Sequence, residues 1–275
     1  MSTDSTPDTT VPSYTTLIVE QRGSALIAQL DRPDKLNAIN VEMAGELNAV
    51  LAKAEADRSV IAVVLAGNER AFCAGADLGR MAAIPGYEWD AYRDRINNAP
   101  HRNLHRTLCF YSKPVISAVE GYCLGGGFEL AMWGDFIVAS ETASFGLPEV
   151  TRGLIPGAGG TQNLPRLIGP ALAKEMIWSG RRITAAEARE FRIVNHVVPK
   201  GCAVDKALEI VEGMARNGPL GIMMSKLAIN RGLDGSRYNG LMTEGDLAHM
   251  LWFSEDRAEG LKAFAEKRPA DFKGQ

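Results

Sequence analysis

The chain has 275 residues, of which 46% are hydrophobic and 23% charged, and its formal net charge is −3. This composition is typical of a globular protein with a sizeable core, and the length suits one large domain or a domain with an appendage. The acidic balance argues against nucleic-acid binding, and no apolar run approaches the length of a membrane span. Four cysteines without a CxxC pair, only four histidines and no secretory signal pattern predict a cytoplasmic protein with reduced thiols and no metal site.

The N-terminal part begins with a polar tail and continues as an α/β pattern. Residues 1–13 are mainly Ser, Thr, Asp and Pro, and we expect them to be disordered. Two short apolar runs, at 16–21 and 25–30, flank an Arg-Gly turn and predict a β-hairpin. Apolar residues at helical spacing predict a helix over 41–56, and a continuous apolar run predicts a buried strand over 61–67.

The middle of the chain repeats this alternation of strands and helices. A glycine-containing loop, AFCAGADL (71–78), follows the buried strand. Residues 79–100 mix aromatic and charged side chains without a clean period, which is typical of a mobile helical flap beside a pocket. A predicted helix over 103–111 then leads into a buried, β-branched strand over 115–119. After a Gly-Gly-Gly break, the pattern predicts a helix over about 127–133 and a further strand over 136–140.

The C-terminal part is mostly helical by pattern. The glycine- and proline-rich stretch over 145–169 is either a long functional loop or contains an element that the pattern hides. From Pro170 the chain is predicted to turn helical and to stay so, with a capping box over Thr184–Glu187. Further helices are predicted over 203–216, 219–231, 238–253 and 256–266.

This order of elements predicts two parts after the disordered tail. Strands mixed with helices indicate an α/β core over 14–200, in which a β-then-helix unit recurs. Helices alone over 201–275 indicate a C-terminal segment whose apolar faces need either a core of their own or another subunit.

Two glycine loops predict a site for a negatively charged oxygen. AFCAGADL and YCLGGGFEL both follow strands, and glycine lets their backbone N–H groups approach a ligand closely. Two such donors that converge on one oxygen make an oxyanion hole, and a helix N-terminus favours the same charge. Our candidates are the N–H groups of Ala76 and Gly126. Tight packing of helix on strand explains either loop alone, whereas the two loops together favour the oxyanion hole.

Two acidic residues stand out because apolar residues surround them. Phe128 and Leu130 flank Glu129, and Leu147 with Pro148 precedes Glu149. A carboxylate in an apolar setting becomes more basic, and two close carboxylates titrate as a pair, which suits general acid–base catalysis. A glutamate favoured by the helix dipole also explains Glu129.

Several other chemistries lack their motifs in this sequence. It has no GxSxG nucleophile elbow, no GxxxxGK[ST] phosphate loop and no HExxH zinc motif, and its GGG does not match GxGxxG. The hypothesis that remains is an oxyanion-binding turn with two nearby carboxylates.

These segments carry a recognisable resemblance. AFCAGADL, GYCLGGGFELAMWGDFIVAS and FGLPEVTRGLIPGAGGTQNLPRLIG together closely resemble the enoyl-CoA hydratase/isomerase (crotonase) family, and within it enoyl-CoA hydratase. RPDKLNAIN and FAEKRPADF are similar to it too, so the resemblance spans about residues 15–273. It implies an α/β fold, a crotonase-like spiral of repeated ββα units, with a C-terminal helical oligomerisation segment that forms a trimer or a dimer of trimers (a hexamer). It also implies an acyl-CoA substrate, with no metal or redox cofactor and no nucleic-acid or membrane partner.

The resemblance also implies roles for individual residues. Ala76 and Gly126 match the positions whose N–H groups hold the thioester oxygen, and Glu129 and Glu149 match the two catalytic acids. The residues that match substrate- or CoA-binding positions are Lys35, Leu36, Ala74, Asp77, Leu78, Gly157, Phe264 and Lys267. Among these, Gly157 matches a glycine over the active-site water. Phe264 and Lys267 match a pair that touches the CoA of a neighbouring subunit.

The reaction implied is the addition of water to a trans-2-enoyl-CoA to give a 3-hydroxyacyl-CoA, as in fatty-acid β-oxidation. Glu129 would deprotonate the water and Glu149 would deliver a proton to the α-carbon, although the reverse assignment is physically possible. The alternatives are an enoyl-CoA isomerase or a specialised acyl-CoA dehydratase, and a non-catalytic or RNA-binding member of the fold. Isomerases work with one acid at the position of Glu149, so the presence of both acids favours hydration. Bulky Phe128 and Trp133, and Asn163 in place of a common Arg, leave the acyl chain length open.

Overall fold

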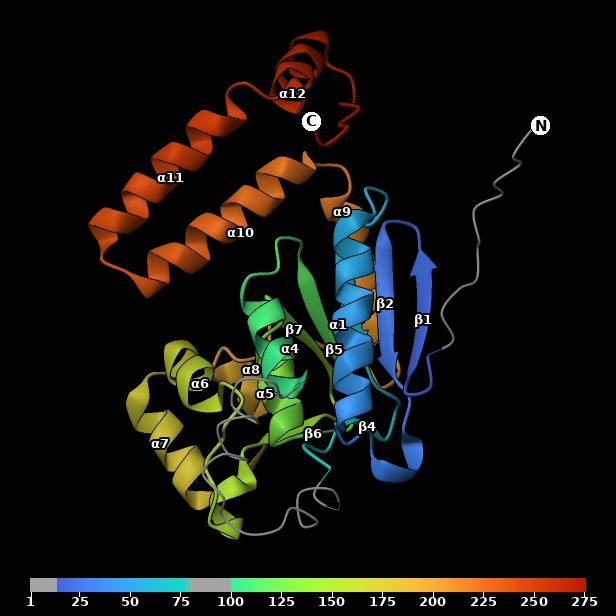
Figure 1. Ribbon diagram of the computed structural model, residues 1–275, viewed down its shortest axis with the longest axis vertical. Coiled ribbons are helices and arrows are strands. Elements are labelled where there is room, and N and C mark those ends of the chain that lie inside the picture. Colours follow the sequence, from blue (N-terminus) through green and yellow to red (C-terminus); the bar gives the residue numbers. More distant parts are fainter. Residues whose placement is uncertain (1–13, 78, 80–99) are drawn as a thin grey trace, which may run out of the picture.

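The computed structural model describes residues 14–77, 79 and 100–275. The predicted disordered tail and, apart from its two end residues, the predicted flap over 79–100 lie outside the described residues. Figure 1 shows strands covered by helices, with a pair of long helices extending from this body. The expected α/β fold is confirmed, and its parts explain how the loops at the candidate site meet.

The larger sheet has six strands in the order β1-β2-β3-β5-β7-β10. β1 runs antiparallel to β2, and the remaining neighbours are parallel. The strands span Leu17–Arg22 (β1), Ala25–Leu30 (β2), Ala62–Ala66 (β3), Val115–Val119 (β5), Phe136–Ser140 (β7) and His196–Val198 (β10). β3 and β5 are buried along their whole length, which is why their sequences are continuous apolar runs rather than alternating ones.

A second sheet of four short strands lies beside the first. Its order is β4-β6-β8-β9, with β9 antiparallel to β8 and the other neighbours parallel. The strands span Ala71–Cys73 (β4), Tyr122–Leu124 (β6), Ser144–Gly146 (β8) and Arg182–Thr184 (β9). β4, β6 and β8 are parallel neighbours, so the loops that follow them leave the sheet at the same edge.

The chain alternates between the two sheets in a repeated unit. In each repeat one strand joins the larger sheet, the next joins the smaller sheet, and a helix follows. The three repeats are β3-β4-α4, β5-β6-α5 and β7-β8-α6, with α4 at Pro100–Cys109, α5 at Gly126–Met132 and α6 at Gly160–Ile168. This arrangement is the spiral of ββα units that we expected.

Helices cover both faces of the larger sheet. α1 (Val41–Ala56) has the predicted bounds, because the Asn40 side chain accepts a hydrogen bond from Met43 N at 2.8 Å and so caps its first turn. Its apolar face packs with α4 and α5 in the main core. α9 (Ala203–Met214) covers the other face, where Ala203, Ala207 and Val211 are buried against the sheet. Although α9 follows residue 200, it therefore packs with the α/β core.

Several predicted elements were wrong or incomplete. The loop predicted at 71–78 begins with strand β4, and β6 and β8 were not predicted, because three-residue strands are too short to show a period. The irregular stretch over 145–169 contains a 3₁₀ helix, η2 (Pro148–Arg152), and α6, whose glycines and internal proline disguise it. The chain does not stay helical after α7 (Pro170–Ser179), because β9 and β10 follow it. The predicted capping box does form, at the start of α8 (Ala185–Glu190).

Three further helices form the C-terminal arm. α10 (Pro219–Asp234) and α11 (Arg237–Leu251) lie side by side, and α12 (Glu255–Glu266) follows them (Figure 1). Lys226 joins the arm to the core, since its Nζ lies 2.8 Å from both Asp135 Oδ2 and the carbonyl oxygen of Lys113. The described chain buries none of the α10 residues, and large apolar side chains of the arm such as Leu233 and Trp252 are exposed.

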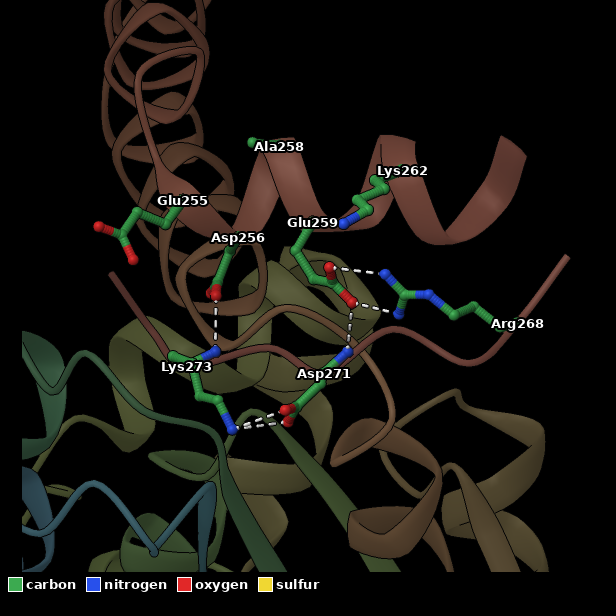
Figure 2. A pocket seen from close by; sticks show the side chains of 8 residues that line it. All are labelled: Glu255, Asp256, Ala258, Glu259, Lys262, Arg268, Asp271 and Lys273. Atoms are coloured by element: carbon green, nitrogen blue, oxygen red, sulfur yellow. Dashed lines mark hydrogen bonds and ion pairs between the residues drawn. The ribbon is translucent and has the colours of Figure 1, made fainter. Parts of the chain in front are cut away.

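The C-terminal tail folds back on α12 (Figure 2). The carboxylate of Asp256 accepts a hydrogen bond from Lys273 N at 2.7 Å, and Glu259 pairs with both terminal nitrogens of Arg268 at 2.6 and 2.9 Å. Asp256 is a buried polar residue, which the hydrogen bonds from Lys273 N and Gly274 N to its side chain explain. The charged side chains that line the cleft between α12 and the tail thus hold the tail against the helix.

Candidate active site

The two glycine loops meet at the edge where β4 and β6 end. A Cβ atom built on Gly126 would lie 3.5 Å from Ala76 N, and one built on Gly75 would lie 3.5 Å from Gly126 N. Gly75 has a φ of +111°, a conformation that residues with a side chain rarely adopt. The backbone amides of Ala76 and Gly126, about fifty positions apart in the sequence, therefore lie next to each other.

Local geometry leaves both amides without a backbone partner in their own element. Ala76 forms an isolated parallel bridge with Ile39, in which Ile39 N donates to Gly75 O at 2.8 Å and Asp77 N donates to Ile39 O at 2.9 Å. Because successive peptide groups point to opposite sides of an extended chain, the N–H of Ala76 points away from Ile39. Gly126 is the first residue of α5, where a backbone N–H has no partner within its helix. Such a pair of donors suits an oxygen atom that carries negative charge.

The three consecutive glycines, Gly125 to Gly127, have different structural roles. Gly125 has a φ of +52° and donates from its N to Gly146 O at 2.8 Å, which joins the loop after β6 to the end of β8. A Cβ atom on Gly127 would lie only 2.2 Å from Cys73 O, so this glycine allows α5 to pack directly on β4. Tight packing therefore explains Gly127, whereas no such contact constrains Gly126.

A third loop, which includes η1 (Pro33–Lys35), supports the loop after β4. The side chain of Asn37, fully buried, donates from Nδ2 to Ala71 O at 2.9 Å, and Ala74 N donates to Leu36 O at 2.9 Å. Leu36 and Asn37 both have positive φ angles, of +49° and +57°. These contacts hold the predicted CoA-binding positions Leu36 and Ala74 against each other.

Arg32 joins the loop that includes η1 to the loop after β4. Its guanidinium lies 2.9 Å from Asp77 Oδ2 and also donates to Ala38 O. This hydrogen bond from Arg32 lowers the pKa of Asp77, so Asp77 is a paired carboxylate beside the Ala76 amide. Sequence reasoning missed Arg32 and Asn37, although an Asn shortly after a Pro in a turn is a recognisable signal for side-chain bonds to backbone.

Glu129 lies in the first turns of α5, buried with 2% of its surface exposed. Its Oε1 accepts hydrogen bonds from Ala158 N at 2.7 Å and from Gly160 N at 2.8 Å. Burial raises the pKa of Glu129 to about 7, the two backbone hydrogen bonds oppose this effect, and the nearby charge of Glu149 adds to it. A carboxyl group with this pKa can take up and release a proton near neutral pH.

Glu149 lies on η2, directly after β8. Its Oε1 is close to the glycine loop, since a Cβ atom on Gly125 would lie 3.1 Å from it. Its Oε2 is buried and finds no hydrogen-bond partner among the residues that the structure describes. Burial raises the pKa of Glu149, while a bond from its own backbone N–H and the charge of Arg152 lower it. The free oxygen of a half-buried carboxyl group is suited to exchange a proton with a bound molecule.

The charge of Glu149 adds to the rise in the pKa of Glu129, so the two carboxyl groups lie near enough to interact electrostatically. They lie on α5, which follows β6, and on η2, which follows β8, while the Ala76 amide follows β4. The structure therefore brings the Ala76 and Gly126 amides near two carboxyl groups of raised pKa. Such an arrangement can stabilise an anionic oxygen, remove a proton from one atom and supply a proton to another.

The remaining predicted binding residues divide into two groups. Lys35 is exposed at the end of η1, and Gly157 is exposed in the turn before α6, next to the amide that binds Glu129. Phe264 and Lys267 lie on α12 and directly after it, at the other end of the molecule from β4 and α5 (Figure 1). They are not part of the site within one chain. Leu78 lies outside the described residues.

The turn over 157–160 contains the predicted Gly157, but Ala158 and Gly160, which supply both hydrogen bonds to Glu129, were not predicted. Its signal was present in the sequence as Gly157-Ala158-Gly159-Gly160, because adjacent glycines leave backbone N–H groups accessible. In the part of the chain that the structure describes, no group of three or more His, Cys, Asp or Glu side chains could hold a metal ion. No helix there is both long and apolar enough to span a membrane. All four cysteines are free thiols.

Comparisons with known proteins agree with this geometry. Residues 20–275 match the family described as enoyl-CoA hydratase/isomerase. A "Probable enoyl-CoA hydratase" of Rhizobium meliloti is 44% identical over 266 residues, which cover 95% of this chain and 99% of that protein. The 2,3-dehydroadipyl-CoA hydratase of Escherichia coli is 41% identical over 259 residues, 94% of this chain and 99% of that protein. The crystal structure of an enoyl-CoA hydratase from Bacillus anthracis superimposes with a TM-score of 0.88 at 39% identity, covering 94% of this chain and all of that chain (100%).

Proposed function

The chain belongs to the enoyl-CoA hydratase/isomerase family, and we propose that this hydro-lyase adds water across the double bond of a trans-2-enoyl-CoA to give a 3-hydroxyacyl-CoA. The observation that carries the proposal is the meeting of two backbone amide donors with two carboxyl groups of raised pKa. An isomerase needs only one of these acids, so the presence of both favours hydration.

The amides of Ala76 and Gly126 would bind the thioester oxygen. When water attacks the β-carbon, electrons move onto this oxygen and form an enolate. Donors that are already in place stabilise the enolate more than the neutral thioester, and this difference lowers the barrier. The reaction uses carboxyl groups, amides and water, so we propose that it needs no cofactor beyond the CoA that is part of the substrate.

The two glutamates would then divide the proton transfers. Glu129, as the base, takes a proton from the water whose oxygen forms the new C–O bond. Glu149, as the acid, gives a proton to the α-carbon as the enolate collapses to the thioester. One proton is taken up and one is given, so the pair ends with its proton on the other glutamate and regains its starting state by exchange with water. The raised pKa of each group suits its part, since it makes Glu129 a better base and keeps Glu149 protonated to higher pH.

The direct test is an assay of the purified protein on trans-2-enoyl-CoA and 3-enoyl-CoA substrates of short to long chain length. We expect loss of the 2-enoyl absorbance as water adds, with the preferred chain length read from kcat/KM. Activity on 3-enoyl substrates alone would reject hydration in favour of isomerisation. Binding of acyl-CoA without turnover would favour a non-catalytic member of the fold.

Replacing Gly126 with Pro should remove one donor of the oxyanion hole and leave the fold in place. Proline is well tolerated at the first position of a helix, where the N–H makes no helical bond. Loss of one such donor typically lowers the rate about 10²–10³-fold, and we expect this loss in kcat. The matched control is Gly126→Ala, which keeps the N–H and adds a methyl group 3.5 Å from Ala76 N. An equal loss in both variants would attribute the effect to bulk and would argue against the donor.

The C-terminal arm supports a proposal about assembly. Large apolar side chains are exposed along it, namely Ile229, Leu233, Tyr238, Leu241, Met242, Met250, Trp252, Phe253, Leu261 and Phe264. We propose that the arm forms a trimer or a dimer of trimers, in which Phe264 and Lys267 reach the CoA of a neighbouring subunit. Lys35, Leu36, Ala74, Asp77 and Gly157 would then border the substrate within one subunit. A cytoplasmic location, consistent with four free thiols, completes the proposal.

A further inference from the structure

We propose that Trp133 is a positioning residue that holds Glu129 in its working orientation by fixing the turn over 157–160. The inference rests on the proposed role of Glu129 in hydration. Trp133 is the residue that directly follows α5, one helical turn beyond Glu129, and its backbone N donates to Glu129 O at 3.2 Å. The Glu129 carboxylate and the Trp133 indole therefore contact the turn from positions one helical turn apart.

The first observation is that the Ala158 residue is hydrogen-bonded from both sides. Its N–H donates to Glu129 Oε1 at 2.7 Å, while its carbonyl oxygen accepts from Trp133 Nε1 at 2.7 Å. One residue of the turn is thus held between the carboxylate and the indole. If the indole bond is lost, Ala158 can rotate, and the N–H that orients the carboxylate loses its fixed direction.

The second observation is the close packing of the next residue. Gly159 has a φ of +111°, and a Cβ atom built on it would lie 2.8–2.9 Å from three atoms of the indole ring. The backbone of the turn therefore rests directly on the ring, and no side chain fits between them. The ring of His105, on α4, lies on Trp133 with centroids 6.1 Å apart. Packing and the hydrogen bond both fix the turn relative to α5.

These two contacts explain how Trp133 would affect the chemistry without touching the substrate. The amides of Ala158 and Gly160 both donate to Glu129 Oε1, and they favour its charged form. A looser turn would weaken these bonds, which raises the pKa of Glu129 further and leaves the carboxylate less well aimed. Trp133 thus differs from a residue that merely stabilises the fold, because its loss should move a pH profile.

The charge that acts on Glu129 is that of Glu149, on η2. The elements near α5 carry further titratable or charged groups, namely Arg152 on η2, Cys73 on β4, Cys123 on β6, Arg166 on α6 and, against Trp133, His105 on α4. Burial raises the pKa of Cys73 to about 12 and raises that of Cys123, so both thiols stay neutral. Arg166 is directed to Gln162 on its own helix. Glu149 therefore remains the main charge that acts on Glu129, and Trp133→Phe leaves it unchanged.

The test is the pH dependence of hydration by Trp133→Phe. This variant keeps an aromatic ring but lacks the N–H donor. We expect kcat to fall about 10- to 100-fold, KM to change little, and the acid limb of the profile to move upward by about one pH unit. Trp178→Phe, which removes an exposed tryptophan on α7, is the matched control and should leave the profile unchanged. If Trp133→Phe does not fold, benzothienylalanine at position 133 tests the same point, because sulfur replaces the N–H within a ring of nearly equal shape.

The outcomes separate this inference from the proposed function. If the wild-type protein does not hydrate 2-enoyl-CoA, the proposed function is wrong. If the acid limb of the wild-type profile persists in Glu129→Gln, the proposed role of Glu129 as the base is wrong. If both of those tests succeed but the variant without the indole N–H keeps the wild-type kcat and acid limb, the positioning role of Trp133 alone is overturned. A fall in kcat with an unmoved acid limb also overturns it, because a general loss of structure explains that result.

Discussion

Replacing Glu129 with Gln should lower kcat/KM for hydration of crotonyl-CoA by about 10²–10⁴-fold, the usual contribution of a general base. The substitution keeps the shape of the side chain, and the amide oxygen can still accept hydrogen bonds from Ala158 N and Gly160 N. The amide cannot take a proton from water. The loss should therefore appear in kcat, while binding of acyl-CoA and the fold remain.

The same substitution should make the fold more stable above neutral pH. In the unfolded chain Glu129 ionises near its ordinary pKa of 4.5, whereas in the folded protein burial raises that pKa to about 7. Below pH 4.5 the carboxyl group is neutral in both the folded and the unfolded state. Its stabilising contribution to the free energy of unfolding is then fully present. As the pH rises from 4.5 through 7, the unfolded state loses its proton more readily and this contribution is lost. At pH 8 the cost of the buried charge is on the order of 3 kcal/mol, which the neutral amide of the variant avoids.

Urea unfolding of both proteins at pH 4.5 and pH 8 measures this effect. We expect the stability advantage of Glu129→Gln to be larger at pH 8. Glu141→Gln is the matched control, because Glu141 is exposed and should show no such pH-dependent difference. A variant that keeps wild-type turnover, or one whose stability advantage does not grow with pH, would contradict the assignment of Glu129 as a buried base. A mild loss of activity with the expected stability change would instead indicate isomerase chemistry.

Replacing Glu149 with Gln should nearly abolish hydration of the same substrate, with a loss of at least about 10²-fold. Its buried Oε2 has no hydrogen-bond partner in the described chain, and we propose that this atom gives a proton to the α-carbon. An amide cannot replace a carboxylic acid in that step. Because burial raises the pKa of Glu149, the wild-type protein should also lose activity at high pH as this proton is lost, and the variant should lose this limb of the profile.

Steady-state rates in light and heavy water, together with acyl-CoA binding, measure the effect of Glu149→Gln. Binding should stay within a few-fold of wild type, since the oxyanion donors are unchanged. Exchange of the α-hydrogen of the 3-hydroxyacyl-CoA with solvent should disappear. Near-normal turnover in this variant would place the proton donor elsewhere. The two glutamate variants together distinguish reactions, because a hydratase needs both acids and an isomerase depends mainly on Glu149.

Long elements and local motifs were predictable from the sequence, whereas short elements and distant contacts were not. The helix over 41–56 has its predicted bounds because sixteen residues carry several turns of a period and a capping Asn precedes them. β4, β6 and β8 have three residues each, so only their pairing with one another makes them strands. Their absence from the prediction matters, because these strands bring the site together.

In the candidate site, too, local contacts were predictable from the sequence and most contacts between distant residues were not. Gly126 and Glu129 lie in one turn of helix, so their proximity follows from local geometry. The meeting of Ala76 with Gly126 was inferred from two similar loops and agrees with the structure. The bonds from Ala158 and Gly160 to Glu129 cross some thirty positions of sequence and depend on how α6 packs on α5. No local pattern indicates a contact of that kind.

The parallel alignment of β4, β6 and β8 sets the spacing between the groups at the site. Neighbouring strands in a sheet lie about 4.8 Å apart, a distance that backbone hydrogen bonding imposes whatever the side chains are. Each of these three neighbouring strands is followed by one part of the site: β4 by the Ala76 amide, β6 by the turn with Gly126 and Glu129, and β8 by Glu149. Substitutions of the side chains around the site can therefore change the shape of the pocket and alter which acyl group fits. They leave the spacing between the proposed oxyanion donors and the two proposed acids almost unchanged, so a single substitution after one of these strands can change the reaction without moving the groups that follow the other two.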